Sequence, residues 1–443
     1  MALPESLHSV VTTGRCCGCG VCAGVATCGQ MHMRLTREGF WEPAVAECAA
    51  CGACTSTCPG LEAPIPDPAA PLGNHRTTVV GYSTSEDERL SGSSGGLATR
   101  VLKALLARGE IDAAVGVRPT GHGNPMFETA VLRTPDEIQA AAGSKYYPVE
   151  FSRPLRELRA SSERFALVGV PCVMTALRLG RERIPWLAEQ CVALIGLACG
   201  HMVSTRYTGF LAEISGVPAA ELTGAEFRRK PGPRSAADFI FAATGADGRE
   251  GQEIPFLTGG GIPVAIWGAR LFTPPACFRC ADLFAVDADL SLMDAWLPEY
   301  TPDRAGTSLA VVRTEVMDEL LEAESAAGRV HLEPIEPEQV VRSQSSPLAN
   351  RRMAIALRRA EDGARLPVGV ALTLWWERLR ARLSNRLPTT PGPGRSLGIA
   401  MIRAWLIVYR PGRRLRRFAI ALAGRIRRLL SPRRKNTERG RGA

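Results

Sequence analysis

Two runs of regularly spaced cysteines stand near the start of the chain. The first run is C-x2-C-x2-C with a fourth cysteine after five further residues, and the second is C-x2-C-x2-C-x3-C followed by proline. Thiolates at this spacing converge from one side of a tight turn, which suits a metal cluster. The eight cysteines in question are Cys16, Cys19, Cys22, Cys28, Cys48, Cys51, Cys54 and Cys58.

The second run has the spacing of bacterial two-cluster ferredoxins, in which the fourth cysteine of each run binds the other cluster. We therefore expect one 4Fe–4S cluster on Cys16, Cys19, Cys22 and Cys58, and a second on Cys48, Cys51, Cys54 and Cys28. Gly18, Gly20 and Gly52 should let the backbone wrap closely around the sulfur atoms. A zinc ribbon also uses paired C-x2-C motifs, but three cysteines per run and the final Cys-Pro favour iron and sulfur. Cys17, next to a ligand, is expected to take no part.

Four further cysteines follow segments of strand-like sequence. Cys172 stands at the start of a predicted helix, where a thiolate is stabilised. Cys199 ends an apolar run, and Cys277 and Cys280 form another C-x2-C pair. Brought together from three loops, these thiols would hold a third cluster. Taken singly, each is better explained as a buried small hydrophobe, which is also what we expect of Cys191 inside an apolar strand.

Small residues also precede a predicted amphipathic helix. The segment is SGSSGG, which comprises Ser91, Gly92, Ser93, Ser94, Gly95 and Gly96. Backbone N–H groups at a helix start form a ready phosphate site, although a simple helix cap is the plainer interpretation. The segment GSKYYP places Lys145 beside Tyr146 and Tyr147; this lysine is either part of a site or solvated in a turn.

Strands and helices alternate between these motifs. Strands are expected within 77–83, 112–119, 127–133, 191–200, 307–314 and 330–335, a helix and then a strand within 154–172, helices within 96–110, 134–144 and 315–328, and a hairpin within 237–256. Such alternation indicates an α+β fold with a layered, α/β-like core.

Charge and composition divide the chain further. The net charge of +10 hides a basic tail, because residues 379–443 carry 18 Lys and Arg and one acid, which leaves −7 for the other 378 residues. We expect four parts: a ferredoxin-like module (1–60), a proline-rich linker (61–76), an oxidoreductase core (77–365) and a basic amphipathic tail (366–443). The first residues do not resemble a signal peptide, and cluster assembly needs a reducing compartment, so a cytoplasmic location is expected.

The core motifs together resemble one family. The order SGSSGG, GSKYY, GVPCVMTALR, GLACGHMVS and CFRCADLFAVDADLSLMDAW is similar to that of the beta subunits of coenzyme F-420-reducing hydrogenases and dehydrogenases, together with 7-hydroxymethyl-chlorophyll reductase. The resemblance covers roughly residues 10–350. It implies bound FAD, one or more 4Fe–4S clusters, and hydride exchange between the flavin and a substrate.

Site residues follow from the resemblance. It implies flavin contacts by residues 91–96 and by Lys145 and Tyr146, a core cluster on Cys172, Cys199, Cys277 and Cys280, and an active-site position for Asp294. Lys145 and Asp294 are the catalytic candidates. His201 is the one histidine near a proposed site, and a structural role is expected for it. The partners implied are a redox protein or ferredoxin and a small hydride donor or acceptor.

The basic tail has three possible interpretations. Arginines alternate with Phe418, Leu422 and Leu429, the pattern of a basic amphipathic helix at an anionic membrane surface. A solvated basic tail and a nucleic-acid contact are the other interpretations, and no nucleic acid is expected as partner. Trp375, Trp376 and Trp405 suit an interface. Two wider alternatives to the enzyme remain: a non-catalytic electron carrier or adaptor, and a membrane-surface assembly protein, for instance beside envelope polysaccharide synthesis.

Overall fold

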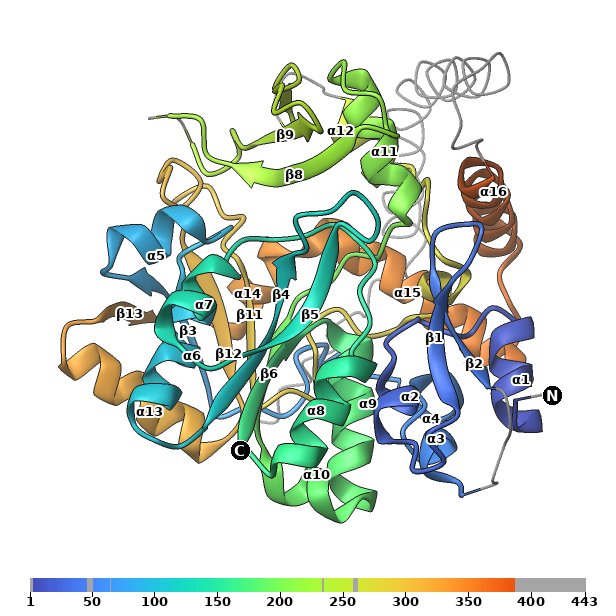
Figure 1. The fold of residues 1–443 in the computed structure, drawn as a ribbon, viewed down its shortest axis with the longest axis horizontal. Helices are drawn as coiled ribbons and strands as arrows, with labels where there is room; N and C mark the ends of the chain where they lie inside the picture. The colour runs from blue at the N-terminus through green and yellow to red at the C-terminus, as the bar shows by residue number, and fades with distance from the viewer. Residues whose placement is uncertain (1–2, 46–50, 64, 233–234, 258–261, 387–443) are drawn as a thin grey trace, which may run out of the picture.

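The structure is a computed structural model that describes residues 3–45, 51–63, 65–232, 235–257 and 262–386. It consists of a small cysteine-rich module, a central mixed sheet covered by helices on both faces, a second small sheet above one edge, and a helical C-terminal segment (Figure 1).

The N-terminal module is a two-stranded hairpin with short helices around it. Its elements are α1 (Glu5–Thr12), α2 (Val21–Val25), β1 (Met31–Leu35), β2 (Trp41–Val45), α3 (Ala53–Ser56) and α4 (Pro59–Glu62). A small core holds it together, in which Leu7 and Val10 of α1 pack beside Met31 and the thiols of Cys54 and Cys58. Cys48 lies outside the described residues.

The central sheet has eight strands in the order β13-β3-β12-β11-β7-β6-β4-β5. The strands are β3 (Thr77–Ser83), β4 (Ala113–Pro119), β5 (Phe127–Leu132), β6 (Phe165–Gly169), β7 (Cys191–Leu197), β11 (Leu290–Asp294), β12 (Ser308–Val312) and β13 (Val330–Pro334). β4, β6, β7 and β11 run parallel to one another, and the outer pairs are antiparallel. Ligands of open parallel sheets bind beyond the carboxyl ends of such strands, so this edge is where a site is expected.

Helices cover both faces of this sheet. They are α5 (Glu86–Ser91), α6 (Leu97–Ala107), α7 (Pro135–Ala140), α8 (Ser152–Ser161), α9 (Pro171–Arg183), α10 (Pro185–Gln190) and α13 (Glu315–Ala326). α6 and α13 pack on one face through Leu105 and Leu320. α8 and α9 pack on the other through Leu155 and Leu177, together with Val21 of the module. The strands and helices predicted within residues 77–335 are present, and the layered mixed α/β architecture is confirmed.

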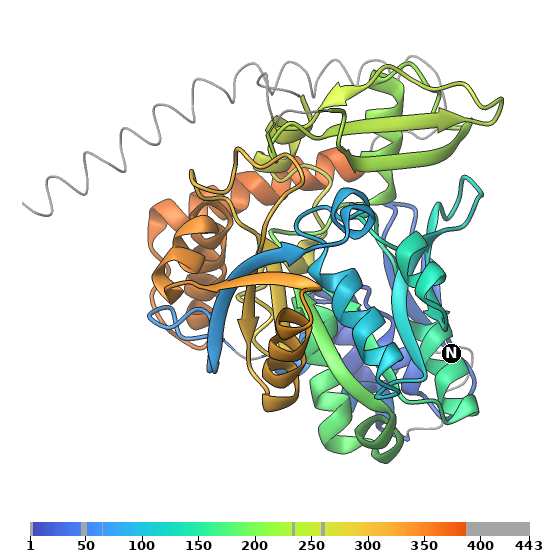
Figure 2. The same ribbon diagram turned by 90° about the vertical axis from the view of Figure 1, so that its left-hand side faces the viewer.

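A second, three-stranded sheet lies above the carboxyl edge of the parallel strands (Figures 1 and 2). This region contains α11 (Thr205–Ile214), β8 (Leu222–Arg229), β9 (Ile240–Gly245), β10 (Ile254–Pro255) and α12 (Ile262–Gly268). Its aromatic core, which includes Phe227 and Phe241, packs against Tyr147 of the main domain. The expected hairpin forms β9 and β10 of this sheet.

Three helices follow the last strand: α14 (Pro337–Ser343), α15 (Ser345–Glu361) and α16 (Val368–Asn385). Val340 and Leu348 pack with Leu309 and Val311 of β12. Leu374 and Ala381 of α16 pack beside Phe278 of the core. The segment expected to be a basic tail from residue 366 therefore begins with a helix docked on the core, and residues 387–443 lie outside the described part.

Candidate iron–sulfur and flavin sites

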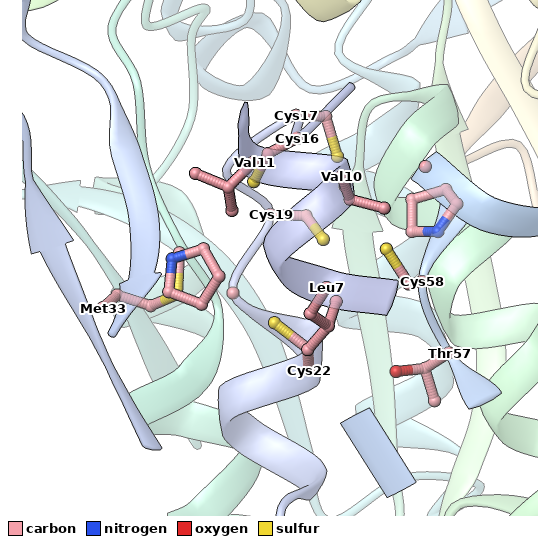
Figure 3. Close-up of a pocket in the computed structure, with 14 residues that line it drawn as sticks. Leu7, Val10, Val11, Cys16, Cys17, Cys19, Cys22, Met33, Thr57 and Cys58 are labelled. Atoms are coloured by element: carbon pink, nitrogen blue, oxygen red, sulfur yellow. The ribbon is translucent and has the colours of Figure 1, made fainter. Parts of the chain in front are cut away.

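The four cysteines assigned to the first cluster lie around one small cavity. Cys16, Cys19, Cys22 and Cys58 all line it, together with apolar residues of α1 and β1. Figure 3 shows the first three along one stretch of chain, with Cys58 facing them from another segment. The free space between them is about 20 Å³, so a cluster requires these thiols to turn outward around it. This is the interleaved grouping that the spacing predicts.

Electrostatics of these thiols favour a bound cation or cluster. Burial raises the pKa of Cys16 to about 12, with a further contribution from Cys17. Burial likewise raises the pKa of Cys58 to about 11 and the pKa of Cys22 well above its usual value. Four buried or half-buried thiols that repel one another as thiolates need positive charge between them, and iron would supply it. The donor set therefore fits a cluster.

Three of the four second-cluster cysteines are described. Cys28 and Cys54 belong to the same small hydrophobic core as Cys58, and Cys54 is buried. Cys51 is exposed, and hydrogen bonds to its sulfur, first from Thr27, lower its pKa. Within the described residues, no three His, Cys, Asp or Glu side chains converge closely enough to hold a single metal ion.

The glycines of the cysteine runs have the conformation that the sequence predicts. Gly18, Gly20 and Gly52 adopt φ values of 72°, 75° and 76°, which side chains rarely tolerate. A Cβ on Gly20 would lie 2.8 Å from the backbone nitrogen of Phe151, so glycine is also needed for contact with the core.

The N-terminal module is docked directly on the core. The Phe151 N–H donates to the Cys19 carbonyl at 2.9 Å, and the Trp41 indole donates to the Pro148 carbonyl at 3.1 Å. Arg156 donates to the Ala23 carbonyl through both Nε and Nη2. The linker packs as well, with Leu72 buried against the sheet. The first cluster site is thereby held against the core.

The second group of cysteines gathers beyond the carboxyl edge of the sheet. Cys172 follows β6 in the first turn of α9, and Cys199 follows the neighbouring parallel strand β7. Cys277 and Cys280 lie on and just after a 3-10 helix, Pro275–Phe278. Adjacent parallel strands end at the same edge, which explains why distant cysteines meet there. Cys191 instead lies buried within β7, as expected.

A cavity of about 350 Å³ separates the module from the core at this point. Cys172 and Cys280 line it from the core, and Cys17 lines it from the module. Of the cysteines that the structure describes, only Cys17 lines both this cavity and the first one. The thiols of Cys17 and Cys172 share a hydrogen bond, which lowers the pKa of Cys17 and raises that of Cys172. The sequence predicts no part for Cys17, yet this residue joins the two groups.

Buried arginines beside the core cysteines fit an anionic cluster. Arg351 is 1% exposed and makes no ion pair with a carboxylate among the described residues. Its guanidinium donates to the carbonyls of Cys199 and Cys280. A buried cation needs a counter-charge, which thiolates bound to a cluster would provide. Sequence reasoning missed Arg351, because it lies on α15, far from any motif.

His201 lies buried in the same region. Its ring is 4.1 Å from that of Trp267, and its Nε2 has no hydrogen-bond partner among the described residues. Burial lowers its pKa well below the usual value, so the ring is neutral. Trp267 in turn lies 4.8 Å from the ring of Tyr146, so an aromatic series runs from the core cysteines toward the proposed flavin site.

The Ser/Gly loop connects α5 to α6, and three hydrogen bonds hold it to two neighbouring segments. Ser93 Oγ accepts from the Ser144 N–H at 2.6 Å, and Ser94 Oγ donates to the Thr307 carbonyl at 2.7 Å. The Gly95 N–H donates to Ser308 Oγ at 2.9 Å. The loop thus lies beside the segment that carries Lys145, as the proposed site requires.

The glycines of this loop have a structural reason of their own. A Cβ on Gly95 would lie 2.7 Å from the Gly81 carbonyl oxygen, and one on Gly96 would lie 2.7 Å from that of Glu88. Glycine is therefore required by backbone packing, whether or not a phosphate approaches. Substitution of these two residues would disturb the fold, so the site has to be tested through side chains.

Two partly desolvated lysines flank the loop. Lys145 Nζ donates to the carbonyls of Ala141, Ala142 and Gly143, and Lys230 Nζ donates to those of Arg89, Ser94 and Ala305. Burial lowers the pKa of each lysine to about 8. Desolvated ammonium groups beside a helix start suit an anionic phosphate. Sequence reasoning missed Lys230, because it follows β8 directly and no motif marks it.

Asp294 ends β11 and is held by a buried arginine. Arg228 of β8 donates through both terminal nitrogens to its carboxylate, at 2.8 and 3.0 Å. Burial alone would lower the pKa of Arg228, but Asp294 and Tyr146 raise it above its usual value. The Tyr146 ring packs on Phe227, and the Arg228 guanidinium lies over the Phe239 ring at 4.3 Å. Asp294, Arg228 and Tyr146 therefore form one network between the two sheets.

Comparison with known families matches this arrangement over most of the core. The family described as "Coenzyme F420 hydrogenase/dehydrogenase, beta subunit" matches with its N-terminal part over residues 78–156 and with its C-terminal part over residues 162–338. The chain belongs to this family. The matched residues include the Ser/Gly loop, Lys145, all four core cysteines and Asp294.

Relatives from Methanosarcina and Methanothermobacter are similar to this chain over much of their length. The chain is 26% identical to a subunit of the F(420)H(2) dehydrogenase of Methanosarcina mazei, over 71% of this chain and 83% of that protein. It is 24% identical to the beta subunit of the coenzyme F420 hydrogenase of Methanothermobacter thermautotrophicus, over 60% of this chain and 86% of that protein. A chain of the F420-reducing NiFe hydrogenase complex from Methanosarcina barkeri shares the fold, with a TM-score of 0.51, 20% identity, and coverage of 69% of this chain and 100% of that chain.

Proposed function

We propose that the chain is an iron–sulfur flavoprotein oxidoreductase. Two 4Fe–4S clusters would be held by the N-terminal module, a third by Cys172, Cys199, Cys277 and Cys280, and FAD by the Ser/Gly loop. The observation that carries the proposal is the contact between Cys17 and Cys172, because it brings the two groups of thiols side by side. The relatives are named for coenzyme F420, which supports a deazaflavin as the substrate class.

The family relationship supports redox chemistry, and this chain's residues have definable parts in it. Bound flavin supplies the conversion between single electrons and hydride. Lys145 and Lys230 would bind its phosphates, and Tyr146 would pack beside it. Arg228, held by Asp294, would present a fixed positive charge at the place where hydride is exchanged. A small deazaflavin, or another molecule with a reducible C=C or CH–OH group, would be the hydride partner.

Electrons would pass through the core cysteines to the N-terminal clusters. The docking hydrogen bonds between the module and the core support a fixed separation of the two proposed cluster sites, which electron transfer requires. A redox protein or ferredoxin would then exchange electrons with the exposed second cluster, where Cys51 lies at the surface. The M. barkeri relative is part of a complex, which supports a protein partner here.

The test is an anaerobic electron-transfer assay with reduced coenzyme F420 on the purified protein. We expect both flavin and iron–sulfur absorbance to bleach in the wild type. In Cys172→Ala, flavin should still bleach, whereas the N-terminal clusters should stay oxidised. Cys191→Ala is the matched control, because Cys191 is buried in β7 away from the thiol groups.

Other results would exclude the enzyme. A non-catalytic electron carrier would contain the clusters, bind no flavin, and show no reaction with reduced F420.

The location of the protein is also part of the proposal. We expect a cytoplasmic protein, with the basic tail of residues 387–443 at an anionic membrane surface. No helix among residues 3–386 that the structure describes is long and apolar enough to cross a membrane.

A further inference from the structure

Helix α16 exposes a row of large apolar side chains and turns several polar side chains toward the core. Besides Leu374 and Ala381, which pack on the core, it carries five apolar side chains that face outward, with exposed fractions of 69% for Val368, 63% for Leu372, 61% for Trp375, 49% for Trp376 and 44% for Leu383. These residues recur at helical spacing and form one stripe, which we call the outer stripe. Contiguous apolar surface rimmed by polar residues marks an interaction site.

Polar contacts on the inner side fix this orientation. Glu377, on the inner side, accepts from the Arg270 guanidinium at 3.4 Å, and both side chains are buried. Ser384 Oγ accepts from the Phe272 N–H at 2.7 Å, and the Asn385 amide donates to the Thr273 carbonyl at 3.1 Å. Turning the helix to bury its outer stripe would break these contacts and leave buried polar groups unpaired. The stripe is therefore held outward by the fold.

The exposed charges of α16 beside the outer stripe are positive. Glu377 is the single acid in α16, and it is buried. The exposed charged side chains at the end of the helix are Arg382 and, directly after the last helical residue, Arg386. Residues 379–443 have a net charge of 18 − 1 = +17, and most of it belongs to the residues that follow the helix. A partner surface must be both apolar and anionic.

We propose that the outer stripe of α16 docks on an anionic lipid surface. Paired tryptophans suit the headgroup region, because their rings are apolar and their N–H groups stay hydrated. Trp375 and Trp376 stack with ring centroids 5.8 Å apart and present such a surface. Neighbouring arginines attract anionic headgroups, and the helix lies on the membrane rather than across it. This surface is independent of the proposed redox chemistry.

The experiment uses the full chain with its cofactors and vesicles of phosphatidylcholine, with and without phosphatidylglycerol. The test variant is Leu372→Ser with Trp375→Ser and Trp376→Ser. The matched control is Val316→Ser, an apolar residue of α13 with 49% of its surface exposed. A third variant ends after residue 386 and keeps α16. Co-flotation measures binding, tryptophan emission reports insertion, and visible absorbance verifies that all variants are folded and loaded.

Wild type and Val316→Ser should bind anionic vesicles with a blue shift of tryptophan emission. The serine variant should bind about tenfold more weakly or worse, and most clearly at high salt, where only apolar contacts persist. The shortened chain should bind less at low salt but keep its blue shift. Unchanged binding of the serine variant, or no binding by wild type, overturns the proposal. The proposal is also overturned if the serine substitutions leave vesicle binding unchanged and break up an oligomer of the protein. That result would identify the stripe as a protein interface.

Discussion

Arg228 and Asp294 form a bidentate ion pair that links the three-stranded sheet to the end of β11. Both terminal nitrogens of Arg228 donate to the carboxylate, at 2.8 and 3.0 Å, and Tyr146 completes the network. The family resemblance predicts Asp294 as a catalytic residue. The geometry indicates that its task is to position Arg228, which is buried and has no other carboxylate partner among the described residues.

Asp294→Asn should therefore destabilise the protein. The substitution leaves Arg228 buried and without its counter-charge, and breaking a buried pair costs about 3 kcal/mol or somewhat less, since Asp294 is partly exposed. Asp112→Asn is the matched control, because Asp112 pairs with Arg164 at the surface, where the cost should be below about 1 kcal/mol. Chemical unfolding measures both. Equal stability losses in the two variants would contradict a structural role for Asp294.

Flavin affinity should depend on the protonation of two lysines. Burial lowers the pKa of Lys145 and Lys230 to about 8, and only the protonated form attracts phosphate. Affinity for FAD should thus be full well below pH 8 and weaken as the pH rises through this value. Lys145→Met combined with Lys230→Met should bind FAD weakly at every pH. Fluorescence titration at several pH values measures this, and a pH-independent affinity in wild type would refute the assignment.

Arg351 should raise the reduction potential of the core cluster. A buried positive charge beside the core thiols stabilises the reduced, more negative form. Arg351→Met should lower the midpoint potential, and Arg351→Lys should restore most of the wild-type value. A redox titration followed by electron paramagnetic resonance gives the potentials. An unchanged potential in Arg351→Met would mean that the cluster lies elsewhere.

Cys17 should influence the core cluster without binding it. Cys17→Ala should retain the iron content of the wild type, whereas Cys172→Ala should lose about four irons. Once Cys172 is bound to the cluster as a thiolate, the Cys17 thiol has to be the donor of their shared hydrogen bond. The loss of this donor should lower the potential of the core cluster, and Cys17→Ser should show a smaller change. Iron analysis distinguishes the roles, because a loss of about four irons in Cys17→Ala would make Cys17 a ligand.

The sequence predicted the elements of the main sheet well. Apolar runs such as 77–83 and 191–200 became β3 and β7, and the capping residue Thr134 begins α7 with a full capping box. Spacing also predicted that Cys58 joins the first cysteine run, because ferredoxin chemistry links spacing to geometry. Local patterns of this kind are readable because each is contained within a few residues.

Contacts between side chains that are far apart in the sequence could not be predicted in this way. Arg228 and Asp294 are 66 residues apart, and Arg351 reaches Cys199 across 152 residues. No local pattern marks such partners, so the arginines that surround the site were missed. The docking of residues 368–385 on the core was missed for a related reason, because the sequence predicted this segment only as part of a basic tail. Its apolar stripe suggested nothing about which face is buried, and its inward polar contacts with Arg270 and Phe272 decide that question.

Cofactor content of the anaerobically purified full chain tests the central claim most directly. Three 4Fe–4S clusters and one flavin predict about twelve irons, an equal amount of acid-labile sulfide and about one FAD per chain. Zinc in place of iron, or a protein that contains iron but no flavin after anaerobic purification and addition of FAD, would contradict the account.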